Sequence, residues 1–181
     1  YKDGLLWKAI GAVGTFTVSA EMGGAIQATF SFQAAYVTPT AVAVPGGAVF
    51  DASLPIVASS SDVISDGAAV KVGSFSIDAG ADVQQHRVTS ENSFTASNRA
   101  PTMTFSKDSV ATAAEWTALA SGTSASLSAA FNALAGNIVT ITAPAGKRTG
   151  DTYGERAERD TIEVAYNLYE SASDDQFAVA F

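Results

Sequence analysis

The chain has 181 residues, no cysteine, and 18 acidic side chains against 10 basic ones, which leaves a formal net charge of −8. This length favours one domain that buries roughly 70% of the unfolded chain's surface, without disulfides or thiolate-bound metal. The acidic surplus argues against a nucleic-acid-binding surface, because affinity for phosphate comes mainly from clustered Lys and Arg. We therefore expect any contact with DNA to occur without tight binding.

Apolar runs in the chain stay shorter than the ~18 residues that a membrane-spanning helix needs, so the sequence predicts no such span. The first residues, Tyr1 to Gly4, lack the basic and then apolar start of a signal peptide. Since the chain starts without Met and reaches an apolar stretch at residues 5–7, we expect the full gene product to have a segment before Tyr1.

Alternation between apolar and polar side chains, the pattern of a strand with one buried face, dominates the N-terminal part of the chain. It covers residues 15–18 and 26–33, and in the second segment the apolar face carries Ile26, Ala28, Phe30 and Phe32. Between the segments, Gly23 and Gly24 supply the backbone freedom that a tight turn uses. We predict a hairpin with its turn near Gly23 and a half-buried second strand.

The middle of the chain begins with a segment rich in Pro, Gly, Ser and Ala, about residues 37–67, in which prolines interrupt any strand ladder. We predict a long irregular loop there, with one or two short strands. Apolar and β-branched runs then predict strands over residues 70–77, 83–88 and 102–106, the last after a turn at residues 99–101.

One short helix is predicted after these strands. Asp108 is a suitable N-cap, residues 111–119 are mostly good helix formers, and Gly122 follows as a stop. The spacing of Trp116 and Leu119 predicts that these two side chains form the buried face of the helix.

The C-terminal part of the chain predicts further strands. In residues 123–135 the Ala-rich composition favours helix, but apolar residues alternate with serines, so we predict a strand. Residues 137–143 predict a strand that Pro144 ends, residues 145–160 a charged exposed loop, and residues 162–168 an alternating strand. The sequence as a whole predicts a single all-β domain over residues 1–181, an antiparallel β-sandwich or barrel with one short flanking α-helix.

Residues that carry chemistry are few and isolated. His86 is the only candidate for proton transfer near neutral pH, and the chain lacks the Gly-x-Ser-x-Gly elbow that would provide a nucleophile. Asp78 and Asp82 flank a turn but provide too few oxygens for a calcium loop. The loop-like segments 11–14 and 145–149 lack the following helix that a phosphate site needs. The sequence predicts no catalytic residue, cofactor or metal, and hence no enzyme.

Some carboxylates occur in pairs of the kind that flank a glycosidic bond in hydrolases, such as Glu155 with Glu158 and Asp174 with Asp175. Both pairs lie in charged or polar segments, where a solvated or interface role is the common outcome. We therefore predict no hydrolytic site from them.

Three motifs spread over nearly the whole chain point to a known family. The first is the hairpin of residues 14–36, the second is residues 75–83 followed by Arg99 and Pro101, and the third runs from Gly136 to the C-terminal residues 174–181. In this order they resemble the major tail tube proteins of long-tailed, siphophage-type bacteriophages. The resemblance implies a β-sandwich or barrel with one flanking helix, and usually hexameric rings that stack into a tube for the genome.

The same resemblance implies a structural virion protein of the phage tail that assembles in the host cytoplasm. Its partners would be further copies of itself and tail proteins such as the tape measure, terminator and baseplate, with DNA passing through the lumen without specific binding. An acidic lumen fits this role, because negative charge repels phosphate. Four acidic residues on or beside predicted strands are candidates for the lumen: Asp78, Asp82, Glu163 and Glu170.

The charged segment provides candidates for contacts between stacked rings, although a solvated loop explains it equally well, since exposed ion pairs contribute only ~0–1 kcal/mol each. The candidates are Lys147, Arg148, Asp151, Glu155, Arg156, Glu158, Arg159 and Asp160. Two other functions stay open. One is a carbohydrate-binding or virion-decoration β-sandwich, which predicts an exposed aromatic platform, and the other is the tube subunit of a contractile injection or secretion machine.

Overall fold

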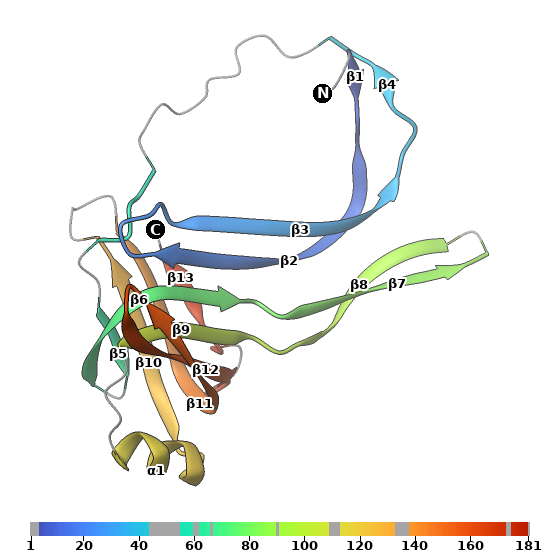
Figure 1. Ribbon diagram of the computed structural model, residues 1–181. Helices are drawn as coiled ribbons and strands as arrows, with labels where there is room; N and C mark the ends of the chain where they lie inside the picture. The colour runs from blue at the N-terminus through green and yellow to red at the C-terminus, as the bar shows by residue number, and fades with distance from the viewer. Residues whose placement is uncertain are drawn as a thin grey trace.

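The computed structural model describes residues 4–43, 55–59, 62–65, 67–89, 91–108, 113–132, 138–172 and 175–180. Over these residues the chain is mostly β, with antiparallel sheets and one short helix, as the sequence predicts (Figure 1). The elements are β1 (Leu5–Leu6), β2 (Ala9–Glu21), β3 (Gln27–Tyr36), β4 (Thr40–Ala41), β5 (Asp62–Ser65), β6 (Ala68–Asp78), β7 (Ala81–Val88), β8 (Glu91–Arg99), β9 (Thr102–Asp108), α1 (Ala113–Ser121), β10 (Ser124–Phe131), β11 (Val139–Arg156), β12 (Arg159–Tyr169) and β13 (Ala178–Ala180).

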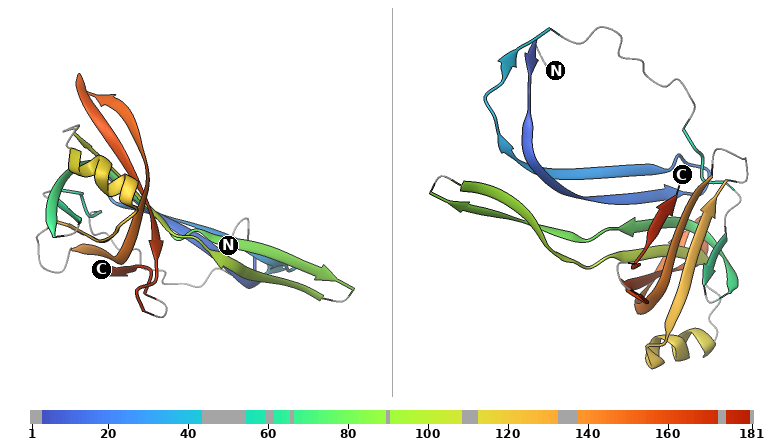
Figure 2. Two further views of the ribbon diagram at one scale, coloured as in Figure 1. Left: turned by 90° about the horizontal axis from the view of Figure 1, so that it is seen from below. Right: turned by 180° about the vertical axis from the view of Figure 1, so that it is seen from behind.

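The largest sheet closes on itself. Its strands follow the order β3-β2-β6-β5-β10-β11-β12-β9, and β9 also pairs with β6, so β6, β5, β10, β11, β12 and β9 form a closed ring of strands. β13 pairs with β11 beside this ring, and α1 lies near one end of it (Figure 2). Closure leaves these six strands without a free edge between them.

Side-chain alternation builds the core of this ring. On β12, Ile162, Val164, Tyr166 and Leu168 are buried while the residues between them are mostly exposed. The strand predicted within residues 123–135 is confirmed as β10, whose Leu127 and Phe131 are buried. These side chains belong to one apolar cluster, whose other members include Phe75, Ile77, Met103, Phe105 and Ile141.

Two long hairpins extend from the closed ring (Figures 1 and 2). The predicted N-terminal hairpin is confirmed as β2–β3, and Gly23 in its turn has a φ of +85°, which glycine adopts without strain. β7 and β8 form the second hairpin, with a ladder from Ala81 and Arg99 to Val88 and Glu91. The strand predicted over residues 83–88 is confirmed as β7, but β8 has polar residues on both faces and is missed.

The burial predicted for β3 is wrong. Phe30 and Phe32 are 59% and 65% exposed, although they share one face as the alternation predicts. A period of two identifies which side chains point together, but it does not say which element covers them. Within the described part of this chain, the outer half of the hairpin has no such cover.

The burial predicted for the helix is wrong as well. Trp116 is 50% exposed and Leu119 only half-buried, so neither side chain is covered as the spacing predicts. Gly122 does end the helix, with a φ of +61° and an N–H that donates to the Ala118 carbonyl oxygen at 3.2 Å. The residues that Asp108 would cap, 109–112, lie outside the described residues.

The predicted charged loop of residues 145–160 is also wrong, because β11 and β12 pair through this segment to Arg156 and Arg159. Its polar residues line an exposed hairpin, with positive φ values at Ala157 and Glu158 in the turn. Pro144 does not end β11. It lies at a bulge opposite β10, between the residues of β11 that pair with β13 and those that pair with β12, where no ladder N–H is needed.

The segment predicted as a long loop, residues 37–67, contains β4 and β5. Its Val57 also forms an isolated bridge with Ala25, which lies outside the segment. Pro45, Asp174 and Phe181 lie outside the described residues. No helix among the described residues is long and apolar enough to cross a membrane.

Candidate functional site

One face of the sheet carries three rows of polar side chains across five strands. Residues paired in register on antiparallel strands point to the same side of a sheet, so the ladder itself defines each row. The rows are Thr29, Thr17, Asp78, Thr102 and Asn167; Gln27, Ser19, Ser76, Thr104 and Ala165; and Glu21, Ser74, Ser106 and Glu163. We call this set the polar face. It is built from hydroxyls, amides and carboxylates, with Ala165 as its one apolar member.

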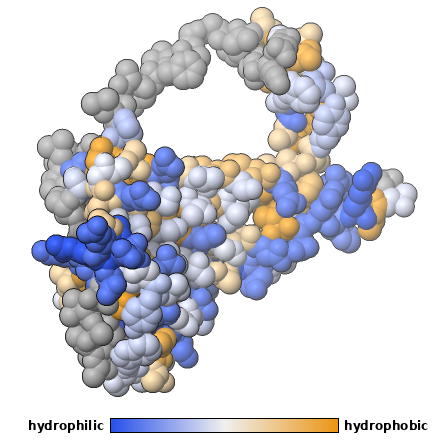
Figure 3. Space-filling model, in the orientation of Figure 1, coloured by the Kyte–Doolittle hydropathy of each residue, from blue (hydrophilic) through white to orange (hydrophobic). Residues whose placement is uncertain are grey.

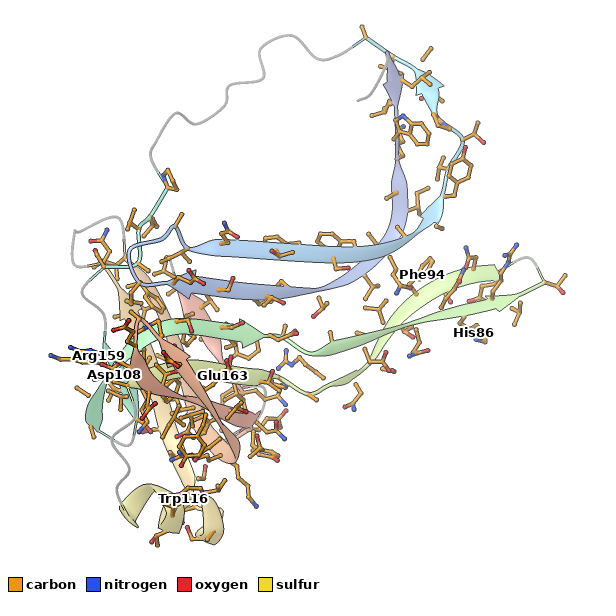
Figure 4. All side chains as sticks on the ribbon, in the orientation of Figure 1. His86, Phe94, Asp108, Trp116, Arg159 and Glu163 are labelled. Atoms are coloured by element: carbon orange, nitrogen blue, oxygen red, sulfur yellow. The ribbon has the colours of Figure 1, made fainter. Side chains whose placement is uncertain are left out.

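The charges on the polar face all have one sign. Glu21, Asp78 and Glu163 are acidic, and none of the residues in the three rows is basic. Glu163 lies on β12, and together with Glu21 it lines a shallow hollow of about 430 Å³ (Figure 4). Asp78 is held in place because its Oδ1 accepts the Gly80 N–H at 2.8 Å. Such a surface offers water many hydrogen bonds and offers phosphate no cation.

The four acidic residues that the sequence singles out divide into two groups. Asp78 and Glu163 lie on the polar face, whereas Asp82 and Glu170 lie outside its three rows. Both oxygens of the exposed Asp82 accept from Gln84 Nε2, at 2.7 and 2.8 Å. Glu170 is exposed just after β12, in a hollow that Arg99 also lines.

Glu21 also lies on the polar face, although sequence reasoning missed it. The signal was present in the sequence, since Thr15, Thr17, Ser19 and Glu21 alternate along one strand. Extending that alternation by one residue would have placed Glu21 beside the polar side chains.

The opposite side of the β2–β3 hairpin is aromatic. Phe16 lies 5.9 Å from Phe30 and 6.0 Å from Phe177 between ring centroids, and Phe30 stacks on Phe32 at 6.2 Å. We call these four residues the aromatic face. Its inner end is anchored by Arg99, whose guanidinium lies 5.8 Å from the Phe177 ring centroid, while Phe30 and Phe32 are exposed.

Apolar surface follows the β2–β3 hairpin in the space-filling view (Figure 3). Exposed apolar side chains occur singly on most proteins, but adjacent exposed aromatics typically mark a surface that associates with another molecule. The aromatic face therefore has the chemistry of a protein contact.

The charged residues of β11 and β12 form one buried pair and one exposed cluster. Arg148 donates from Nε and Nη2 to the two oxygens of Asp151, at 2.7 and 2.6 Å, with side chains 7% and 5% exposed. Arg156 and Arg159 lie 3.5 and 3.7 Å from Asp108 oxygens at the exposed end of the hairpin (Figure 4). Lys147, Glu155, Glu158 and Asp160 are exposed too.

The isolated candidates for catalysis lie apart from one another. His86 is exposed on β7, opposite Ser93 (Figure 4). The segments 11–14 and 145–149 lie inside β2 and β11 rather than before a helix. Asp175 holds a turn, since its carboxylate accepts the N–H groups of Ala172 and Ser171. Within the described ranges, no three His, Cys, Asp or Glu side chains gather as a possible metal site.

The chain therefore combines a closed ring of strands, two projecting hairpins, an acidic polar face and an aromatic face. Among curated proteins, no sequence matches the chain. A family model described as phage tail tube protein matches residues 4–168. The chain therefore belongs to the phage tail tube proteins, a family of self-assembling, non-enzymatic structural components of the phage tail, as the sequence motifs predict.

Proposed function

We propose that this chain is the major tail tube subunit, that it assembles into hexameric rings stacked into a tube, and that the polar face lines the channel for phage DNA. The observation that carries the proposal is the composition of that face, three carboxylates among hydroxyls and amides with no basic residue in its rows.

The chemistry of the polar face suits a conduit. A protein binds DNA tightly when its Lys and Arg side chains replace the counterions of the phosphates. A face without Lys and Arg therefore binds a duplex weakly, so that the duplex can move along it. The carboxylates repel phosphate, and the hydroxyls and amides keep the wall hydrated. Among the acids predicted for the lumen, Asp78 and Glu163 fit this surface, and Glu21 joins them.

Strand edges supply the ring contacts in this proposal. Among the described residues β3 ends the sheet order, and its ten residues leave about 34 Å of edge without a ladder partner there. A free edge of that length is a template for pairing with another chain. If the β2–β3 hairpin of one subunit meets the β7–β8 hairpin of the next, the contact is heterologous and repeats around a closed ring.

The aromatic face completes the same contact. In a ring, the exposed Phe30 and Phe32 pack against the body of the neighbouring subunit and lose their contact with water. Burial there stabilises the assembly and leaves the polar face open to the channel.

Stacking between rings falls to the exposed charges of the β11–β12 hairpin in this proposal, namely Lys147, Glu155, Arg156, Glu158, Arg159 and Asp160. Arg148 and Asp151, also predicted for this role, neutralise each other inside the chain and would act by shaping the hairpin. The tape measure, terminator and baseplate proteins are the proposed partners at the ends and inside of the tube, with assembly in the host cytoplasm.

A decoration or carbohydrate-binding role has one observation in its favour. Trp116 and Tyr153 are about half exposed and stack at 6.4 Å between ring centroids, which is the kind of platform on which a sugar ring packs (Figure 4). A glycan array with the wild-type chain and a Trp116→Ala variant tests this second role.

Electron microscopy with light scattering across a protein concentration series tests the tube. We expect rings or hollow tubes, with sixfold symmetry in end-on class averages. A monomer at every concentration would contradict the proposal.

A further inference from the structure

We propose that Gly14 is a positioning residue for the contact between subunits, because it lets the Phe32 ring lie against β2 in the orientation that a neighbouring copy meets. This inference rests on the proposed function, in which the next subunit of the ring covers the aromatic face. It adds that the orientation of this face is fixed before the subunits meet.

Gly14 and Phe32 face each other across the β2–β3 ladder, so both lie on the side of the hairpin that carries the aromatic face. A Cβ added at Gly14 would lie 2.5 Å from Cδ1 and 3.0 Å from Cε1 of Phe32, and it would also collide with the Ser31 carbonyl oxygen. Carbon atoms that are not bonded to each other prefer ~3.5–4.0 Å. The Phe32 ring therefore occupies the space that any larger side chain at position 14 would need.

The neighbouring pair on the same face shows what the missing side chain changes. Phe16 pairs with Phe30, and their rings are tilted by 36° at 5.9 Å between centroids. Phe30 and Phe32 are instead parallel, with 3° between the ring planes and 6.2 Å between centroids. Because β2 has no side chain opposite Phe32, this ring can lie across the backbone of β2 and remain parallel to Phe30.

The fixed orientation matters because Phe32 is 65% exposed. An exposed side chain ordinarily samples several rotamers and loses that freedom when another molecule covers it. The Phe32 ring contacts both Phe30 and the backbone at Gly14, so it has fewer orientations to lose. This preorganisation favours association without adding a contact between the subunits.

A second copy of this chain is the molecule that meets the Phe32 ring. The chain belongs to a self-assembling family, and Phe32 lies on β3, whose edge has no ladder partner among the described residues. A strand that pairs with this edge brings its own side chains beside Phe30 and Phe32, on the same face of the extended sheet. The strand edge then sets the position of the neighbour, and the ring orientation sets how closely its side chains fit.

NMR of the unassembled chain tests where the ring lies. One Hα of Gly14 faces the Phe32 ring and the other does not, so the ring current should separate the two Hα shifts. Phe32→Leu should remove most of this separation, and Tyr169→Leu, on β12, should leave it unchanged. A separation that survives Phe32→Leu would overturn the proposal. Gly14 itself is kept in this measurement, so the result does not depend on the folding of a Gly14 variant.

Light scattering on single and double variants tests the effect on assembly. Gly14→Ala should raise the protein concentration at which tubes form by roughly tenfold. In a Phe32→Ser background the same substitution should have an effect at least about threefold smaller, because the two residues act as a unit. Gly150→Ala is the matched control and should change little, since a Cβ there would meet nothing within 4 Å and Gly150 is not one of the proposed contact residues.

The outcomes separate this proposal from the tube itself. Equal effects of Gly14→Ala in the two backgrounds would overturn the role of Gly14, because they would show that it acts through the β3 backbone at Ser31 and not through Phe32. Assembly of Gly14→Ala at the wild-type concentration would overturn it as well. A wild-type chain that stays monomeric at every concentration would instead contradict the proposed function, whereas the Gly14 shifts still report the position of the ring in that monomer.

Discussion

The closed ring of strands and the projecting β2–β3 hairpin differ in how their apolar side chains are buried. In the ring, Phe131 and Ile77 are fully buried by other strands of the same chain. On the β2–β3 hairpin, Phe30 and Phe32 align just as regularly but remain exposed. The apolar side chains of the ring are thus covered within one chain, whereas the hairpin carries an apolar face that the rest of the described chain leaves exposed. We therefore expect folding and assembly to depend on separate sets of residues.

The largest expected difference between the two regions is in subunit stability. Phe131→Ala should lower the free energy of unfolding by about 3–5 kcal/mol, because Phe131 is 0% exposed and packs on Phe75. Phe32→Ala should change it by less than about 1 kcal/mol, since Phe32 is 65% exposed. Denaturant unfolding of the unassembled protein measures both, and similar losses would contradict the comparison.

Assembly should show the reverse sensitivity. Phe32→Ser should raise the protein concentration at which tubes form by roughly tenfold or more, because the neighbouring subunit loses an aromatic contact. Tyr169→Ser is the control, since Tyr169 is also about half exposed, at 48%, but lies at the end of β12 and outside the proposed contacts. Light scattering with microscopy gives the result, and unchanged assembly of the Phe32 variant would rule out the aromatic face as a contact.

Reversing charge on the polar face should create DNA retention. Glu21→Lys combined with Glu163→Lys places two cations among hydroxyls, so assembled tubes should bind duplex DNA in a salt-sensitive way, with a slope of roughly −0.9 per phosphate contact. Ser126→Lys combined with Thr142→Lys, at exposed positions of β10 and β11 outside the polar face and the proposed contacts, controls for binding to the outside. Equal DNA binding by this control would remove the distinction between the two surfaces.

The smallest expected effect concerns the turn beside β13. The N–H groups of Ala172 and Ser171 hold the pKa of Asp175 below its ordinary value of 3.8. Because the folded pKa is the lower one, this carboxylate contributes stability above pH 3.8 and loses it as pH falls through the folded value. Asp175→Asn should therefore lower the Tm slightly at neutral pH, and its difference from wild type should shrink in acid. A difference that is independent of pH would contradict this role.

Alternation predicts much of the fold, because a strand with a wet side and an apolar side has a clear period. β2, β3, β10 and β12 follow from it, and apolar or β-branched runs predict β6, β7 and β9. β8 follows from neither pattern, because residues such as Asn92, Thr95 and Ser97 leave both of its faces polar. The extension of β11 to Arg156 is not predicted, because its glycines and charged residues are typical of a loop.

Contacts between residues that are far apart in the sequence are the second part of the structure that the sequence does not predict. The β6–β9 pairing that closes the ring joins residues such as Phe75 and Phe105. No local sequence pattern predicts this pairing, because the two strands are far apart in the chain. For the same reason the sequence placed Asp78 and Glu163 among the candidates but could not show that ladder pairing brings them onto one face with Glu21. The exposure of Phe32 could not be predicted either, because the alternation does not show whether another part of the chain covers that face.

A cryo-EM reconstruction of assembled tubes tests the central claim most directly. We predict that Glu21, Asp78 and Glu163 face the channel, and that the neighbouring subunit covers Phe30 and Phe32. A tube with the polar face on its outer wall or between rings, or with Phe30 and Phe32 still in contact with solvent, would contradict the claim.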